Sequence, residues 1–438
     1  MLALPILFII SCSKTDLKQN DLTVNTESKA NSGKAERDKA DVAHDWYILQ
    51  YHILLERNSA FNAIYYAYQG IGLYEAVRPG IRGGQSFYGK IRTMPKMPEP
   101  ENNQGYNYVI CANAAMADMT RMLFTGLTDA NKKAIDDLEA RYNAQETPGM
   151  GSTVFERSRA YGKAIAQAVY NWYKTDDIIT NSIGYIVPTG PGLWEPTPPG
   201  NVSPPVNAFF GKGTTMVASL NDVICKPFPY TYSEDPASDF YKMVKQVYDQ
   251  KKINTPAQEQ TARHWIDQGN GLGYTPGGHD FYIMTQCMQQ AGVSLDVAAE
   301  AYAKAGIGER DGSIVTFRSK YKNNLVRPIT YIRKVIEPGW NSFITTPPHP
   351  EYPAAHAGVT GSAMLSCATV VGDNVPVVDK AYEFRSFPDK HYTSLFDAVH
   401  DAGISRNYGG IHYLISIKEG TELAQQVAME VGKIKVRD

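Results

Sequence analysis

The sequence predicts an all-α protein, and three observations support this fold class. Apolar residues recur at intervals of three and four from Asp41 to Val77, which is the period of a helix with one buried face. The same period returns along most of the later chain, whereas the strict alternation of half-buried strands is nearly absent. Hydrophobic residues make up 43% of the 438 residues, enough to bury a sizeable core. We therefore expect one large helical domain over residues 41–438.

Ten further helices are expected after the first helical region. In each of these segments the apolar positions follow the helical period. They span residues 106–122, 128–145, 152–175, 236–252, 256–268, 280–306, 309–324, 357–372, 394–405 and 416–433. Thr128 and Asp280 are predicted N-caps, because a short polar side chain before a helix can accept hydrogen bonds from its first free amides.

The N-terminal segment predicts export with a lipid anchor. An apolar run from Leu2 to Ile10 ends in Ser11-Cys12, which resembles a bacterial lipobox, in which cleavage before the cysteine exposes it for acylation. An ordinary secretory signal is the alternative, and no Lys or Arg precedes the run, where signal peptides usually carry positive charge. Residues 13–40 contain no aromatic residue and few aliphatic ones, which predicts a flexible tether. The expected location is the periplasm or the cell surface.

One long interruption breaks the helical pattern. Residues 186–216 carry seven prolines and no helical period, and loops of this length in compact domains are usually functional or disordered. Three aromatic residues favour a packed loop; they are Trp194, Phe209 and Phe210. The four cysteines after the lipobox show no CxxC spacing and are expected to be buried free thiols; they are Cys111, Cys225, Cys287 and Cys367. The formal net charge of -2 argues against a dedicated nucleic-acid binder.

Three C-terminal segments carry the candidate site. The first holds Lys320 and, after six residues, Arg327-Pro328; the second is Pro353-Ala354-Ala355-His356; the third is Ser405-Arg406, five residues, and His412. Two guanidinium forks and one ammonium from separate segments suit a tetrahedral oxyanion. Of two histidines beside such an anion, one can attack or ligate the central atom while the other transfers protons. We therefore predict an oxyanion site.

This three-part pattern resembles the vanadium-dependent haloperoxidases, within a superfamily that includes type-2 phosphatidic acid phosphatases and bacterial class A acid phosphatases. The superfamily pattern reads K-x6-R-P, then P-S-G-H, then S-R-x5-H-x3-D. The flanking sequences resemble the bacterial haloperoxidase branch; they are "RPITYIR", "TPPHPEYP", "SRNYGGIHY" and "GPGLWEPTPPG". The resemblance covers most of residues 41–438. It implies two packed helical bundles, with the site in the C-terminal part at about 309–438.

The resemblance implies roles for the matching residues. The groups that would bind the equatorial oxygens of vanadate or phosphate are Lys320, Arg327, Arg406 and the amide of Ala355. His412 would be the axial vanadium ligand, or the phosphorylated nucleophile of a phosphatase. His356 would be the acid–base group beside the apical oxygen. The implied activity is oxidation of a halide by hydrogen peroxide with vanadate as cofactor.

His349 refines the halide expectation. It lies seven residues before His356, where family chloroperoxidases carry phenylalanine and bromoperoxidases carry histidine. The resemblance therefore implies bromide or iodide as substrate. The alternative is that His349 only caps its loop. The organic substrate and the oligomeric state do not follow from the sequence.

Three departures from the family pattern leave other functions open. Ala354 replaces a serine, Ala355 replaces a glycine, and Ser416 replaces the aspartate that would orient His412. Losing one donor from an anion cradle can cost about a hundredfold in rate. The alternatives are a phosphomonoesterase acting on a phosphate ester through His412, without vanadate, and a non-catalytic surface lipoprotein that retains the fold. Membrane contact is expected only through the N-terminal lipid.

Two other segments are weaker candidates for a functional site. His279-Asp280 follows "GYTPGG" at an expected loop-to-helix junction, with a metal site as the less favoured interpretation. Asp397 and Asp401 lie four residues apart on the helix that leads to Arg406. They could pair with that arginine, although a solvated helix face is the more common arrangement.

Overall fold

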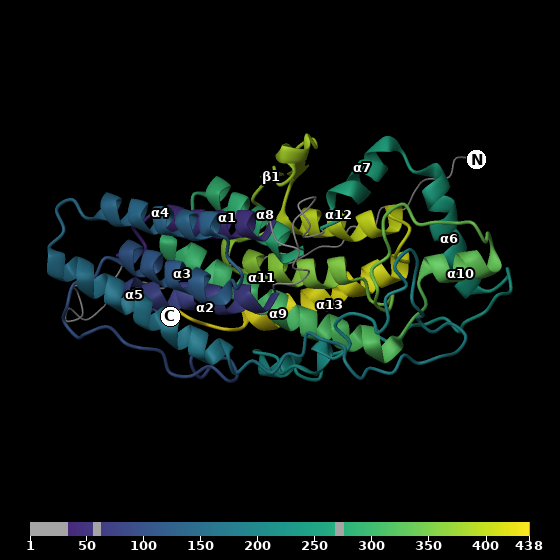
Figure 1. Ribbon diagram of the computed structural model, residues 1–438, viewed down its shortest axis with the longest axis horizontal. Helices are drawn as coiled ribbons and strands as arrows, with labels where there is room; N and C mark the ends of the chain where they lie inside the picture. Colours follow the sequence, from purple (N-terminus) through teal and green to yellow (C-terminus); the bar gives the residue numbers. More distant parts are fainter. Residues whose placement is uncertain (1–33, 56–62, 268–275, 438) are drawn as a thin grey trace, which may run out of the picture.

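The computed structural model describes residues 34–55, 63–267 and 276–437. Helices dominate these residues and lie mostly along the long axis of an elongated molecule (Figure 1), so the all-α prediction is confirmed. The first five are α1 (Asp41–Leu55), α2 (Ala63–Val77), α3 (Tyr108–Leu123), α4 (Asp129–Glu146) and α5 (Ser152–Tyr173). The other eight are α6 (Asp239–Ile253), α7 (Pro256–His264), α8 (Pro276–Ala291), α9 (Leu295–Asn323), α10 (Pro328–Val335), α11 (Gly361–Val371), α12 (Leu395–Tyr408) and α13 (Leu414–Gly432).

The remaining regular structure is short. Strands β1 (Val377–Asp379) and β2 (Lys390–Tyr392) form an antiparallel pair, and the pattern of the sequence did not reveal it. A π-helical turn, η4 (His356–Thr360), leads directly into α11. Single 3-10 turns complete the fold; they are η1 (Arg78–Gly80), η2 (Phe210–Lys212), η3 (Ala218–Leu220) and η5 (Glu383–Arg385).

Helix α9 runs through the centre of the molecule and is buried almost all round, with α2 and α11 as its main neighbours (Figure 1). Glycines make the closest contacts. A Cβ atom on Gly306 would lie 2.4 Å from the carbonyl oxygen of Tyr66, and one on Gly70 would lie 2.4 Å from that of Tyr302. Because no side chain separates the two backbones there, α2 and α9 pack unusually closely.

The structure corrects two sequence predictions about this region. The expected helices 280–306 and 309–324 are divided elsewhere: α8 ends at Ala291, before Gly292 with a φ of 62°, and α9 continues through positions 307 and 308. Asp280 is not an N-cap, because it lies inside α8 and is fully buried. Thr128 does cap α4, where its hydroxyl accepts from the amide of Asn131.

The proline-rich loop and the cysteines largely match their predictions, whereas part of the predicted tether does not. The proline-rich loop is packed, since Trp194 and Phe210 are buried, whereas Phe209 is only half-buried. All four predicted thiols are free and buried. Residues 34–40, assigned to the tether by the sequence, contact the body: the carbonyl of Asp38 accepts from the amide of Leu295 at 2.9 Å. Cys12 and residues 13–33 lie outside the described residues.

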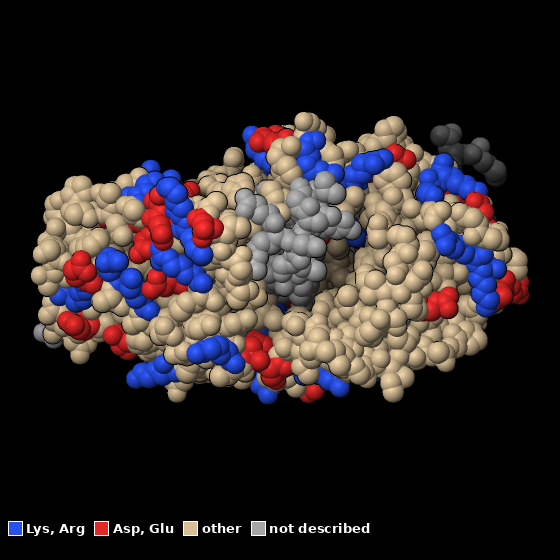
Figure 2. All heavy atoms as spheres, in the orientation of Figure 1, with Lys and Arg blue, Asp and Glu red and all other residues tan. Residues whose placement is uncertain are grey.

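The surface matches the nearly balanced charge of the chain. On the face in Figure 2, basic and acidic side chains are interspersed rather than gathered by sign. Within the described residues, none of the helices has both the length and the apolar character needed to cross a membrane.

Alanine at either contact glycine is expected to destabilise the fold. Gly70→Ala and Gly306→Ala should each lower the free energy of unfolding by about 1–3 kcal/mol, because the two backbones must move apart. Gly105→Ala is the control, since its Cβ would meet nothing within 4 Å, and a change within about 0.5 kcal/mol is expected. Urea unfolding followed by circular dichroism measures all three. Unchanged stability in both contact variants would contradict the close packing of α2 on α9.

Candidate active site

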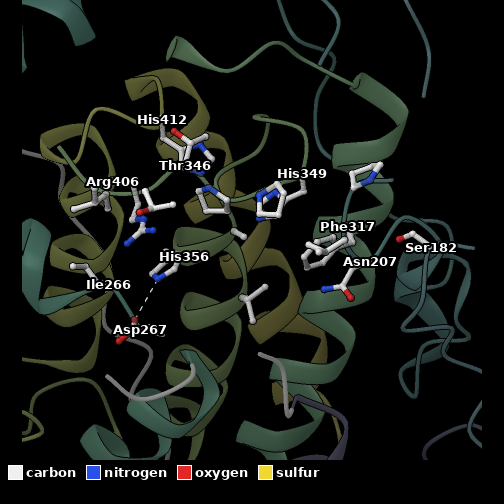
Figure 3. Close-up of a pocket in the computed structure, with 18 of the residues that line it drawn as sticks. Ser182, Asn207, Ile266, Asp267, Phe317, Thr346, His349, His356, Arg406 and His412 are labelled. Carbon is white, nitrogen blue, oxygen red and sulfur yellow. Dashed lines mark ion pairs between the residues drawn. The ribbon is translucent and has the colours of Figure 1, made fainter. Parts of the chain in front are cut away.

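A cavity of about 1040 Å³ opens beside the proline-rich loop. Five of the predicted site residues line it: His349, Ala355, His356, Arg406 and His412. Figure 3 shows His356, Arg406 and His412 around one end, with Phe317 and Asn207 toward the other. Lys320 and Arg327 are not part of the lining; they lie behind the loop that carries His349. The three segments of the motif therefore meet at one place.

Arg327 ties the segments together from behind the cavity wall. It precedes Pro328, which starts α10, and its side chain is fully buried. Its Nε donates to the carbonyl of His349 at 2.8 Å, and Nη1 donates to the carbonyl of Ile411 at 3.0 Å. Nη1 also lies 3.1 Å from His412 Nε2, and Nη2 lies 3.1 Å from His349 Nδ1. Burial lowers the pKa of Arg327 to about 10, although Glu351 acts in the opposite direction.

Lys320 is held in a similar way at the C-terminal end of α9. Its Nζ donates to the backbone carbonyls of Pro350 at 3.0 Å and Glu351 at 2.9 Å. Burial lowers the pKa of this ammonium group well below its usual value, and the charge of Arg327 lowers it further. An ammonium group has three donors, so one remains for another acceptor.

Arg406 reaches the cavity from α12. One terminal nitrogen donates to the carbonyl of Trp265, while Nε is buried and meets no hydrogen-bond acceptor among the described residues. Burial lowers the pKa of Arg406 to about 10, and Asp267 opposes that shift. The possible pairing of Arg406 with Asp401 is not found: Asp401 instead accepts from the indole of Trp265 at 2.8 Å.

His412 is fixed by a carboxylate that the sequence did not reveal. Its Nδ1 lies 2.7 Å from Glu351 Oε1, and the amide of Tyr413 donates to the same oxygen at 3.0 Å. Because a carboxylate accepts and Arg327 donates, the partners define the tautomer with the proton on Nδ1 and the lone pair on Nε2. Burial lowers the pKa of His412 well below its usual value, so the ring is neutral.

Glu351 therefore takes the place of the aspartate that Ser416 replaces. The hydroxyl of Ser416 lies 3.5 Å from the backbone carbonyl of Glu351, a long contact. Burial raises the pKa of Glu351 to about 7, although Arg327 and Lys320 lower it. One signal was present in the sequence: Glu351 is the single acidic residue among the prolines between His349 and His356.

His356 faces a second carboxylate that sequence reasoning missed. Its Nε2 lies 3.2 Å from Asp267 Oδ2 (Figure 3), although the two atoms are not aligned for a hydrogen bond. Burial lowers the pKa of His356 to about 4; the charge of Arg406 adds to the shift and Asp267 opposes it. Asp267 follows α7, and no motif in the sequence pointed to it.

The remaining predicted residues occupy distinct positions. His349 is buried, with its ring centroid 5.5 Å from that of Phe317 in an edge-on arrangement. Ala355 lines the cavity where η4 begins, and the first amides of a helical turn have no partner within the turn. Ala354 is buried outside the lining, and its amide donates to the carbonyl of Ser416 at 3.0 Å.

The charges around this end of the cavity do not balance. Three buried cations, Lys320, Arg327 and Arg406, face two buried carboxylates, Asp267 and Glu351. Burying a cation without a partner is costly, and a bound anion would offset that cost and satisfy the free Nε of Arg406. The fold and site thus define a helical protein with a buried, positively charged pocket end that also carries two neutral histidines, His356 and His412.

Comparisons with known proteins show which proteins this chain is similar to. Residues 300–436 match the family model described as the VCPO second helical-bundle domain. A bacterial vanadium-dependent iodoperoxidase has 26% sequence identity and a TM-score of 0.80, over 92% of this chain and 98% of that chain. The apo form of a bacterial vanadium-dependent chloroperoxidase has 15% identity and a TM-score of 0.61, over 85% and 92% of the two chains. The holo form of a bacterial vanadium-dependent chloroperoxidase has 13% sequence identity and a TM-score of 0.60, over 93% of this chain and 95% of that chain.

A comparison with curated proteins finds no match. The family model and the iodoperoxidase structure support the resemblance seen in the motifs: this chain is similar to vanadium haloperoxidases.

Removing the charge of Glu351 is expected to weaken anion binding. Glu351→Gln should raise the dissociation constant for orthovanadate by about 10- to 100-fold, because the amide holds the Nδ1 proton of His412 less strongly. Glu419→Gln is the control: Glu419 is also buried and accepts from a backbone amide, that of Lys226. Isothermal titration calorimetry with orthovanadate measures both variants. Equal affinity in the Glu351→Gln variant and the wild type would show that this carboxylate does not orient the ligand.

Proposed function

We propose that this protein is a vanadate-dependent haloperoxidase that uses hydrogen peroxide to oxidise bromide or iodide. The observation that carries the proposal is the state of His412, whose Nδ1 proton is held by Glu351 while Nε2 keeps its lone pair. A carboxylate behind the ring is the usual arrangement of a metal-ligating histidine. The similarity to a bacterial vanadium-dependent iodoperoxidase, at 26% sequence identity, supports the same function.

The residues present fit vanadate. His412 Nε2 would be the ligand, and the oxygens would receive hydrogen bonds from Arg406 and from Arg327, whose Nη1 lies 3.1 Å from that nitrogen. Lys320, behind the loop of His349, would add positive charge. The Nη1 group of Arg327 now donates toward the lone pair of His412 Nε2, so this donor would transfer to an oxygen of the anion. When bound, vanadate supplies a Lewis-acidic centre at which peroxide is activated.

His356 is suited to receive the proton that peroxide releases. Its pKa of about 4 keeps the ring neutral at ordinary pH, as a base requires. Nε2 lies beside Asp267, which leaves Nδ1 as the nitrogen for a ligand in the cavity. The carboxylate of Asp267 would stabilise the imidazolium that forms after proton transfer.

His349 is the residue that we propose to influence the halide. It lines the cavity with Nδ1 toward Arg327 and is kept neutral, because burial lowers its pKa well below the usual value. A neutral ring beside a guanidinium group and the edge of Phe317 forms a weakly polar wall for a large, polarisable anion. This environment favours iodide or bromide over smaller, more strongly hydrated chloride.

Replacing His412 tests the proposed activity. His412→Ala should reduce vanadate- and peroxide-dependent bromide and iodide oxidation by at least about a thousandfold, because the ligand is lost. His400→Ala, an exposed histidine on α12, is the control and should retain wild-type activity. The same preparations are tested for hydrolysis of 4-nitrophenyl phosphate without vanadate. Hydrolysis without halide oxidation would assign a phosphomonoesterase, and inactivity in both assays would favour the non-catalytic binding protein.

We also propose that the protein is exported and held at the bacterial membrane, in the periplasm or on the cell surface, by a lipid on Cys12. The support is the apolar run that ends in Ser11-Cys12. Cys12→Ala should abolish incorporation of labelled palmitate and move the protein out of the membrane fraction, while Cys111→Ala, a buried thiol, should change neither. Continued labelling of the Cys12→Ala variant would contradict the anchor.

A further inference from the structure

A buried row of alternating imidazoles and carboxylates ends at His356. His264 Nε2 lies 2.6 Å from Asp379 Oδ2, and His279 Nε2 lies 2.9 Å from the same oxygen. His279 Nδ1 lies 2.9 Å from Asp267 Oδ1, and Asp267 Oδ2 lies 3.2 Å from His356 Nε2. The row joins α7, β1, α8 and the segment after α7 to the turn that carries His356.

A metal ion is the first alternative for part of this row. The possible ligand atoms of His264, His279 and Asp379 all lie within 4.8 Å of one another. Two ligands of a tetrahedral zinc ion, however, are separated by about 3.3 Å, since each lies about 2.0–2.1 Å from the metal. Separations of 2.6 and 2.9 Å between the nitrogens and the shared oxygen are those of hydrogen bonds. The distances therefore favour a hydrogen-bonded network.

His279 is the charged centre of this network. Both of its ring nitrogens face carboxylate oxygens, so both must donate, and a histidine that donates twice is an imidazolium. Burial alone would lower its pKa, but Asp379 and Asp267 outweigh burial and raise the pKa to about 10. The row has its own support, because the hydroxyl of Tyr382 donates to Asp267 Oδ1 and the amide of Ala381 donates to Asp379 Oδ1.

The groups that face His356 come from several elements. Asp267 approaches from the segment after α7, Arg406 from α12 and His279 from α8. His349 lies near enough for the two rings to influence each other's protonation. The other helices packed on this turn present small or uncharged groups: Gly312 and Thr316 of α9, and Gly420 of α13. Asp280 of α8 also reaches this turn, at Thr360, but burial raises the pKa of its carboxyl group well above the usual value. Asp267 is the carboxylate that lies directly against the His356 ring, and His279 holds Asp267 through its Nδ1.

We propose that His279 is a positioning residue for His356: clamped between Asp379 and Asp267, this buried imidazolium fixes Asp267 against His356 and sets the protonation of the His356 ring. This proposal rests on the proposed function, because the acid–base role of His356 belongs to that function. The placement and titration of the rings are properties of the vanadate-free chain, so they can be tested separately.

The test measures histidine pKa values by NMR in full-length, vanadate-free protein with 13C-labelled histidine. The His356 signal is assigned by its loss in His356→Gln. His279→Gln keeps an N–H donor for Asp267, so Asp267 stays in place, but it removes a positive charge near His356. The pKa of His356 should therefore rise by about one unit. Asp267→Asn removes the carboxylate, so His356 should stay neutral down to the lowest pH at which the protein remains folded. Opposite shifts are expected because the two residues carry opposite charges.

His44→Gln is the matched control. His44 is also buried, pairs with Tyr302 at 2.9 Å and lies outside the row, so the His356 pKa should not move. If His279→Gln fails to fold, Asp379→Asn serves instead: it keeps His279 and should lower the pKa of that ring below about 10 through the loss of one carboxylate.

Three results would overturn the proposal. The first is a His279 ring that titrates near its usual pKa in the wild type. The second is a change of the His356 pKa in the same direction in His279→Gln and Asp267→Asn. The third is stoichiometric zinc in the purified protein that is lost in His279→Gln. The NMR result does not depend on catalysis. A protein without haloperoxidase activity but with opposite His356 shifts would therefore refute the proposed function and leave the network intact.

Discussion

The burial of Lys320, Arg327 and Arg406 at one place is the constraint on which the rest of the site depends. Each cation has been taken out of water, and the two nearby carboxylates, Glu351 and Asp267, do not neutralise all three. Buried charge is tolerated when hydrogen bonds replace water, and here backbone carbonyls accept from every one of the cations. The surplus positive charge makes an anion the natural occupant of the site.

The proline-rich segment around His349 explains how so many carbonyls become available. Proline has no N–H, so a run of prolines offers acceptors without donors that would compete for them. Pro350 accepts from Lys320, and Pro347 and His349 accept from Arg327. The same loop supplies Glu351 to His412. This segment thus accepts hydrogen bonds from Lys320 and Arg327, orients His412 through Glu351 and lines the cavity.

The order and spacing of the motif predicted that Lys320, Arg327, Arg406, His356 and His412 lie near one another, because these residues belong to three segments with fixed internal spacing, and the structure places the three segments together. Asp267 and Glu351 could not be predicted in the same way. Their roles depend on which segments meet in space, and a single acidic residue in a loop has many possible partners. The expected division between residues 306 and 309 was wrong: Gly306 and Gly308 lie inside α9, where they allow close packing against neighbouring helices. Helix periodicity, by contrast, predicted most other elements to within a few residues.

Helix α9 has a consequence for how the molecule can be divided. Its 29 residues span about 43 Å; it packs near its middle against α2 and ends at the site with Lys320. The stretch recognised as a separate unit in relatives, residues 300–436, begins inside this helix. A fragment cut there would lose the first turn of α9 and uncover the glycine-lined groove where α2 belongs. The start of the matched region is therefore not a point at which this protein can be cut into two parts that each keep their packing.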